Sequence, residues 1–346
     1  MSFKNIICYD LNNGNKIPAV ALGTFLVGDK LLYTYVLDDV LEKSLNTALE
    51  IGYRHIDTAT FYFNEHTIGK VLQKWFTSGK LNREDVFITT KLPFNALRAE
   101  LAPKYLKKSL EKLKLDYVDM YLMHGPFGWM EGVESDNMMP KDAEGNLKLE
   151  NIDHIAVWRA LEELVDAGLT KSIGVANFSE RQIQRLLDNA RIPPSNLQIE
   201  VHLEFQQTSL VDFCQRNNIV VSAHTTLGSP GSLKQLLGKS IPSIMENPGV
   251  VKIAKKYKKS PAQIALRFSI QRGIVVLPKS VHENRIAENF DVQDFEIDDE
   301  DMECLKSLDR GEDGRRLIFQ EHFPGIEKHP EYPFPILPKE KLLRKK

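Results

Sequence analysis

Short runs of apolar residues alternate with longer amphipathic segments along most of the chain. The short runs have the length of buried strands, and the longer segments repeat apolar residues every three or four positions, as helices packed on a sheet do. The predicted strands are Ala19–Gly23, His55–Asp57, Val86–Lys91, Tyr117–His124, Ser172–Val175, Leu197–Glu200, Ile219–Ala223 and Ile274–Pro278. The predicted helices between and after them are Asp38–Ile51, Glu65–Trp75, Arg98–Lys112, Ile152–Ala167, Glu180–Asn189, Ser209–Asn217, Pro261–Gln271 and Arg285–Phe290.

This strict alternation predicts parallel strands joined by right-handed crossovers. Eight such units favour an α/β fold of the (β/α)8 TIM barrel type. A doubly wound open sheet is the alternative, because periodicity does not prove that the sheet closes. The 346 residues would also suffice for two ordinary domains. We expect a single domain, with a β-hairpin cap at residues 1–18, the barrel at 19–309 and a C-terminal substrate loop and tail at 310–346.

Two long insertions interrupt the pattern, at Gly125–Asn151 after the fourth predicted strand and at Thr225–Lys259 after the seventh. The second contains an additional predicted helix, Pro248–Tyr257. Because loops at the carboxyl ends of barrel strands form the functional face, we expect both insertions, and the aromatic tail from Arg310, at the barrel mouth. Surface decoration is the alternative interpretation.

Composition narrows the class of protein without identifying a function. The hydrophobic fraction of 42% and the charged fraction of 27% are typical of soluble globular proteins. A net charge of −2 argues against non-specific electrostatic binding to nucleic acid or to an acidic membrane. There is no run of eighteen apolar residues, and the three cysteines have no metal-binding spacing. We therefore expect a cytoplasmic protein, a monomer without a bound metal.

The residues at the ends of the predicted strands suggest chemistry, since such residues converge on one mouth in a barrel. A lysine that ends an apolar strand, as Lys91 does, is costly unless it meets an opposite charge, and Asp57 is the available carboxylate. A free phenol titrates near about 10, and a nearby ammonium lowers its pKa. Tyr62 would then donate a proton to a carbonyl oxygen that His124 orients. Taken singly, each residue also has an ordinary structural explanation, as a cap or a packing residue.

Five segments together resemble the aldo-keto reductase family: Gly52–Glu65, Ile88–Lys91, Asp119–His124 with Pro126, Ser172–Phe178 and Leu277–Ser280. The similarity extends from about Ile7 to Leu308, with the motifs in the order and spacing of the family. The resemblance implies a TIM barrel and NADPH as hydride donor. It also implies that Asp57, Tyr62, Lys91 and His124 form a catalytic tetrad.

A cofactor site is indicated by Lys279 and Ser280 at the end of the last strand and by Arg285 in the helix that follows. Cations beside a helix N-terminus suit a phosphate monoester, although a solvated basic surface is the alternative. The resemblance assigns this cluster to the 2′-phosphate of NADPH, and so implies a preference for NADP(H). It assigns the rest of the cofactor site to Thr24, Asn177, Gln198, His224, Leu227, Ser229 and Asn289.

Four positions depart from the family pattern. Ala176 replaces a common serine, and His224 replaces the tyrosine that stacks on the nicotinamide, so we expect weaker or more pH-sensitive cofactor binding. Phe25 and Gly125 stand where tryptophans often line the substrate pocket, which predicts a wider cavity. Phe127 and Trp129 from the first insertion are then expected to rebuild the wall, and with Phe25 and His124 to contact the substrate.

The expected function is NADPH-dependent reduction of aldehydes or ketones to alcohols, that is, alcohol dehydrogenase (NADP+) chemistry on a small carbonyl substrate with an apolar body. A bulky, steroid-like ketone is a weaker hypothesis that rests on Gly125. A short-chain dehydrogenase would show a glycine-rich dinucleotide motif and Tyr-x-x-x-Lys, and the sequence contains neither. The remaining alternative is a non-catalytic, reductase-like protein with a structural or cofactor-sensing role.

Overall fold

The computed structural model describes residues 6–25, 38–132, 138–229 and 242–338. An antiparallel hairpin of β1 (Cys8–Asp10) and β2 (Lys16–Pro18) opens the described chain, as predicted. Eight parallel strands then form one sheet: β3 (Leu22–Gly23), β4 (His55–Asp57), β5 (Phe87–Leu92), β6 (Met120–Met123), β9 (Ile173–Ala176), β10 (Asn196–Glu200), β11 (Val220–His224) and β12 (Ile274–Val276).

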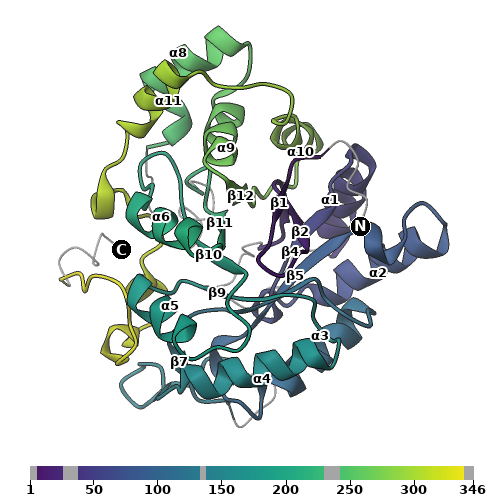
Figure 1. The fold of residues 1–346 in the computed structure, drawn as a ribbon, viewed down its shortest axis with the longest axis vertical. Helices are drawn as coiled ribbons and strands as arrows, with labels where there is room; N and C mark the ends of the chain where they lie inside the picture. Colours follow the sequence, from purple (N-terminus) through teal and green to yellow (C-terminus); the bar gives the residue numbers. More distant parts are fainter. Residues whose placement is uncertain (1–5, 26–37, 133–137, 230–241, 339–346) are drawn as a thin grey trace.

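The sheet closes on itself. The strands pair in the order β12-β11-β10-β9-β6-β5-β4-β3, and a parallel bridge between Val20 and Val276 joins the two outer strands. Backbone hydrogen bonds on both sides of this bridge, Ala21 N to Val276 O at 2.9 Å and Val276 N to Ala19 O at 2.8 Å, continue the ladder. The closed barrel is therefore confirmed and the open-sheet alternative is excluded (Figure 1).

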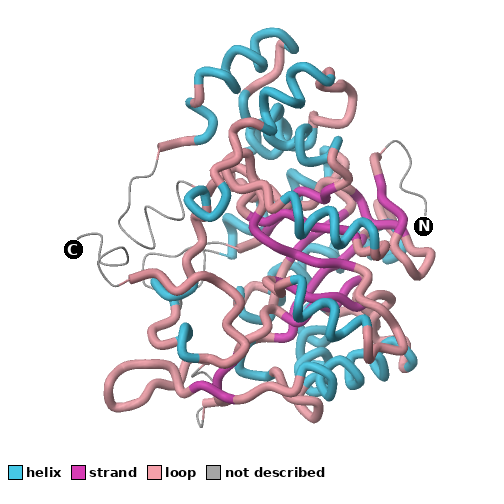
Figure 2. Tube along the Cα trace, turned by 60° about the vertical axis from the view of Figure 1, so that its left-hand side comes forward, coloured by secondary structure: helices cyan, strands magenta, loops and turns pink. Residues whose placement is uncertain are grey.

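Helices surround the sheet, as Figures 1 and 2 show. Those that alternate with the strands are α1 (Asp38–Ile51), α2 (Glu65–Thr77), α3 (Ala102–Leu113), α4 (His154–Asp166), α5 (Glu180–Leu187), α6 (Thr208–Arg216), α9 (Pro261–Gln271) and α10 (Glu283–Phe290). Outside this alternation lie α8 (Pro248–Tyr257), α11 (Asp299–Lys306) and the short α12 (Phe319–His322). Every predicted helix is present, and α1, α8 and α9 have the predicted bounds.

The N-terminal hairpin covers the amino-terminal end of the barrel. Its turn residue Asn13 donates to the carbonyl of Lys171 at 3.0 Å, and Asn12 donates to the carbonyl of Pro194 at 2.8 Å, just before β9 and β10 begin. Leu11 and Ile17 pack with apolar side chains inside the barrel at this end. The hairpin thus fills the end of the barrel that is opposite to the strand tips where chemistry was predicted.

The first insertion and the C-terminal segment cover the other end. The insertion forms a small antiparallel pair, β7 (Gly128–Trp129) with β8 (Leu149–Glu150). Its aromatic and methionine side chains share one cluster with Phe319, Phe323 and Ile326 of the C-terminal segment. Within the described ranges, no helix has the length and apolar character needed to cross a membrane. The end of the chain, residues 339–346, lies outside the described residues.

Candidate active site

Three of the four predicted catalytic groups meet at the ends of β4 and β5. Lys91 is fully buried in β5, and its ammonium donates to Asp57 Oδ1 at 2.8 Å and to the carbonyl of Thr58 at 2.8 Å. The same nitrogen lies 3.3 Å from Tyr62 Oη. The lysine therefore bridges the carboxylate and the phenol, as the costly position of a cation at the end of an apolar strand predicted.

The loop that carries Tyr62 is fixed by buried polar side chains. Tyr62 ends a single 3-10 turn, Thr60–Tyr62, and Phe63 follows with a left-handed φ of 57°. Thr60 Oγ1 donates to the carbonyl of Lys91 at 3.1 Å. Asn64 accepts from Thr58 Oγ1 at 2.9 Å and donates to the carbonyl of Thr24 at 2.8 Å. These bonds hold the turn against the strands, so the phenol has a defined position.

Burial changes the expected protonation of Tyr62. Removal from water raises the pKa of the phenol, and the neighbouring Lys91 ammonium offsets this only in part, so the pKa is above its usual value. The prediction that Lys91 lowers the pKa below that of a free phenol is therefore wrong in its net direction. Burial also disfavours the charged form of Lys91, but Asp57 and Tyr62 together raise its pKa. At neutral pH the site holds a protonated phenol beside an ammonium.

His124 lies beside Tyr62 and is neutral. It follows β6, and its ring centroid is 5.7 Å from that of Tyr62, at an interplanar angle of 73°. Burial lowers the pKa of His124 well below its ordinary value, and the Lys91 charge lowers it further. A neutral imidazole retains one N–H donor, so His124 can donate a hydrogen bond without adding a second cation to the site.

The two residues predicted to hold a carboxamide also lie at this mouth. Gln198 Nε2 donates to Asp57 Oδ2 at 2.7 Å. Asn177, whose φ is 63°, donates to the carbonyl of His124 at 2.9 Å, and its Oδ1 lies 3.2 Å from His224 Nε2. Burial lowers the pKa of His224 to about 4, so this ring is neutral at physiological pH. A charge on His224 would therefore appear only under acid conditions, and its effect on cofactor binding stays a prediction.

One cavity of about 720 Å³ joins the catalytic group to the predicted phosphate site. Its walls include Asp57, Tyr62 and His124 as well as Lys279, Ser280 and Arg285. The remaining residues predicted to bind the cofactor, Thr24, Asn177, Gln198, His224, Leu227, Ser229 and Asn289, also line it. The predicted cofactor residues, drawn from segments far apart in the sequence, therefore share one space.

The chemistry of these walls fits a phosphorylated cofactor. No ion pair joins Lys279 or Arg285 to a carboxylate among the residues that the structure describes. Burial lowers the pKa of the Lys279 ammonium, which an anion would stabilise. Arg285 lies in the first turn of α10, whose N-terminal amides favour negative charge. Two cations without counter-ions beside a helix N-terminus suit a phosphate group.

Two of the predicted substrate contacts are wrong. Phe127 and Trp129 are fully buried and do not line the cavity, whereas Phe25 and His124 do. The ring of Phe94 separates both residues from the site, because it stacks on Trp129 at 5.1 Å and on Phe127 at 5.5 Å. These side chains form the hydrophobic core of the insertion. They therefore stabilise the loop and do not contact a substrate in the cavity.

The predicted widening at Gly125 is also absent. A Cβ atom at Gly125 would lie 2.6 Å from Cε1 of Phe94, so the aromatic ring already occupies the space that the glycine leaves. Phe94 lies two residues after the end of β5 and was not selected by its position in the sequence. Only the fold brings it over Gly125.

Glu200 and Arg316 were also missed, and they attach the C-terminal segment to the mouth. Glu200, buried at the end of β10, accepts from the backbone N–H groups of Arg316 at 2.8 Å and Leu317 at 3.0 Å. The Arg316 guanidinium donates to Glu204 at 2.9 Å and to the carbonyls of Gly228 at 3.2 Å and Pro242 at 3.1 Å. The criterion that selected Asp57, an acid at a strand end, would have selected Glu200 as well.

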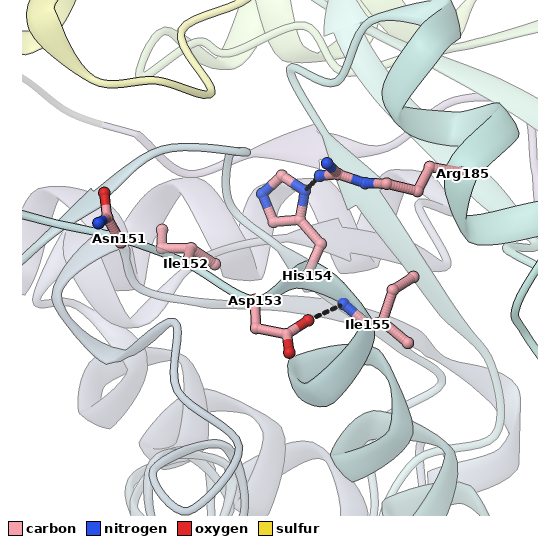
Figure 3. A pocket seen from close by; sticks show the side chains of 6 residues that line it. All are labelled: Asn151, Ile152, Asp153, His154, Ile155 and Arg185. Atoms are coloured by element: carbon pink, nitrogen blue, oxygen red, sulfur yellow. Dashed lines mark hydrogen bonds between the residues drawn. The ribbon is translucent and has the colours of Figure 1, made fainter.

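A second pocket, of about 460 Å³, shares no lining residue with this cavity (Figure 3). It lies at the start of α4, where Asp153 accepts from the backbone N–H of Ile155 at 3.0 Å. Arg185 donates to Nδ1 of His154, which donates through Nε2 to the carbonyl of Pro126 at 2.6 Å. Arg185 also pairs with Glu331 at 2.8 Å. Because these polar groups bind one another, we assign the pocket no ligand.

Comparison with known proteins gives similarities over nearly the whole chain. A model of the Aldo/keto reductase family matches residues 19–310. Aldo-keto reductase family 1 member C15 of Rattus norvegicus is 39% identical over 96% of this chain and 99% of that protein. Prostaglandin F synthase 1 of Bos taurus is 39% identical over 94% and 96%. The solved aldose reductase of Schistosoma japonicum superposes with a TM-score of 0.83 at 38% identity, covering 95% of this chain and 99% of that one.

Proposed function

The chain belongs to the aldo/keto reductase family, and we propose that it reduces aldehydes or ketones to alcohols with NADPH as the hydride donor. The proposal depends chiefly on the position of the Lys91 ammonium, which lies 2.8 Å from Asp57 and 3.3 Å from the Tyr62 hydroxyl. Asp57 and Tyr62 both line the cavity. The family membership supports carbonyl reduction in general. The roles of the individual residues are part of the proposal.

In this mechanism the chain supplies a proton and fixes the geometry. Tyr62 is protonated at neutral pH and donates its proton to the carbonyl oxygen as negative charge develops there. The Lys91 ammonium stabilises the phenolate that remains, and Asp57 keeps the lysine charged. His124 donates a hydrogen bond that orients the carbonyl. The chemistry that the cofactor supplies when bound is a hydride for the carbonyl carbon.

The preference for NADPH is supported by the unpaired cations. Lys279, Ser280 and Arg285 would hold the 2′-phosphate, a group that NADH lacks, and Asn289 would contact the adenine. Asn177 and Gln198 would hold the carboxamide, while Leu227 and Ser229 would border the pyrophosphate. All of these residues belong to one chain, so the proposed cofactor site needs no residue from a second copy.

The proposed substrates have an apolar body. Beside Tyr62 and His124, the cavity is lined by Phe25, Phe61, Phe94, Leu317, Phe319 and Phe323. A steroid-like ketone loses its support, since Phe94 fills the space over Gly125 on which that hypothesis rested.

A carbonyl panel tests the proposed function. Purified protein should oxidise NADPH in the presence of aromatic and aliphatic aldehydes, and should do so far more slowly with NADH. A protein that binds NADPH but reduces no carbonyl compound in the panel would support the non-catalytic alternative instead.

A substitution of Arg285 tests the assignment of the 2′-phosphate site. Arg285→Ala should weaken NADPH binding by about tenfold or more, because it removes a charged hydrogen-bond donor, and should leave NADH binding unchanged. Lys43→Ala is the matched control. Lys43 is an exposed cation of α1 that pairs with Glu283 of α10, the helix that carries Arg285, and it does not line the cavity. Equal losses for both cofactors would contradict the assignment.

A further inference from the structure

Phe94 occupies an unusual place behind the catalytic histidine. It begins the 3-10 turn Phe94–Ala96, two residues after β5, the strand that carries Lys91. Its ring is only 3% exposed, yet it is part of the cavity wall. One face of the site is therefore made by a side chain that is almost wholly enclosed by protein.

The ring of Phe94 is held by three others. It lies nearly parallel to the imidazole of His124, with centroids 4.6 Å apart and an interplanar angle of 21°. It is also nearly parallel to Trp129 and Phe127, at 20° and 3°. Because Phe127 and Trp129 are themselves fully buried, Phe94 cannot turn away without displacing a packed aromatic cluster.

Gly125 and Phe94 fit each other. Gly125 is not among the glycines of the described chain with positive φ, so its backbone conformation does not require glycine. Space does, because a Cβ atom there would meet Cε1 of Phe94 at 2.6 Å and Cδ1 at 3.3 Å. A side chain at position 125 therefore has to push the ring out of the stack on His124.

We propose that Phe94 is the residue that sets substrate width in this enzyme, and that it also positions His124. This inference rests on the proposed function. The ring closes the cavity on the side of His124, so a carbonyl compound with a bulky group on that side is excluded, while a slender aldehyde fits. The stacking contact keeps the imidazole plane aligned with the space where the carbonyl oxygen binds. Phe94 and Gly125 act as one unit in both respects.

Substitution of Phe94 tests the width. For Phe94→Ala, the ratio of kcat/KM for benzophenone to kcat/KM for benzaldehyde should rise by about tenfold or more over the native ratio, since removing the ring opens the wall. The ratio should rise less for Phe94→Leu, because leucine fills more of the space of the ring than alanine does. This variant also replaces Phe94→Ala as the test if the alanine variant does not fold. Phe76→Ala, a partly buried phenylalanine outside the cavity, should leave the ratio unchanged. A native ratio in both Phe94 variants would overturn the proposal.

A double-mutant cycle tests the pairing with Gly125. Gly125→Ala alone should lower kcat/KM for benzaldehyde by about tenfold, because it displaces the ring that positions His124. In the Phe94→Ala background the same substitution should cost less than about twofold. An equal loss in both backgrounds would reject the pairing. NADPH binding, followed by fluorescence, should stay native throughout. If the native protein reduces neither of these compounds nor any other carbonyl compound of the panel, the proposed function fails, and the inference fails with it.

Discussion

At Lys91, burial and charge pairing act in opposite directions. It is fully buried, and its partner Asp57 is 4% exposed. Burial disfavours the ammonium, whereas Asp57 and Tyr62 favour it strongly enough to raise its pKa. An ion pair of this kind adds little net stability, but removing one partner leaves an uncompensated charge. This weak net contribution to stability agrees with the proposed role of the pair in the chemistry of Tyr62.

The variant Lys91→Met should be both inactive and less stable. It leaves the Asp57 carboxylate buried with Gln198 as its remaining side-chain donor, which should lower the free energy of unfolding by about 3 kcal/mol. The double variant Asp57→Asn/Lys91→Met should recover most of this loss but no activity. Urea unfolding measures the difference, and a single variant as stable as the native protein would contradict the account of the pair.

The sequence was sufficient to predict the positions of site residues that lie at the ends of strands. Asp57, Lys91 and His124 each follow or end a short apolar run, and parallel strands in a barrel place such ends together. The net rise in the pKa of Tyr62 was not predictable, because it depends on how much water the folded loops exclude. Phe94 was missed for a similar reason, since its partners Gly125 and Trp129 belong to the next βα loop.

Among the elements, the C-terminal segment is the one that the alternating pattern could not place. Its position is determined by buried polar contacts, chiefly Glu200 with the backbone at Arg316 and Leu317, and Arg316 with Glu204. The helix α11 and the short helix α12 were not predicted, because both follow the last βα unit, where the alternating pattern ends. The eight βα units were predictable because each buries a regular apolar face.

Arg316 links this segment to the part of the mouth next to Leu227 and Ser229. Replacing it with glutamine removes donors to the carbonyls of Gly228 and Pro242, and should weaken NADPH binding by about tenfold through loss of the local backbone position. Arg310→Gln is the control, because Arg310 is exposed and lies 4.0 Å from the same Glu204. Fluorescence titration gives both values of Kd. A similar effect in the two variants would mean that Arg316 acts only through its charge.

At the scale of the whole molecule, the two ends of the barrel differ: one is filled by packed side chains and the other holds the cavity. The hairpin fills one end, while the cavity lies among the strand tips and loops at the other. Three histidines in different parts of the molecule are neutral rings: His55 and His154 are buried, and His224 is half-buried in the cavity wall. Removal from water lowers the pKa of each to about 4. They couple the stability of the entire fold to pH.

The sign of this coupling follows from the direction of the shifts. The folded protein binds protons on these rings less readily than the unfolded chain, whose histidines titrate near about 6.5. Stability is therefore highest above pH 6.5 and falls as the pH is lowered towards 4. At pH 5 the loss should be roughly 2 kcal/mol per histidine. Urea unfolding at pH 7 and pH 5 measures it, and His154→Gln should show a smaller drop. Identical drops in the two proteins would exclude His154 as a contributor.

The most direct test of the central claim is the turnover of Tyr62→Phe with NADPH and an aldehyde that the native enzyme reduces. The substitution removes one oxygen and leaves the ring in place. We predict that kcat falls by at least about 10²-fold while the Kd for NADPH stays native, because only the proton donor is lost. Turnover close to that of the native enzyme would show that the proton comes from another group, and would contradict the mechanism.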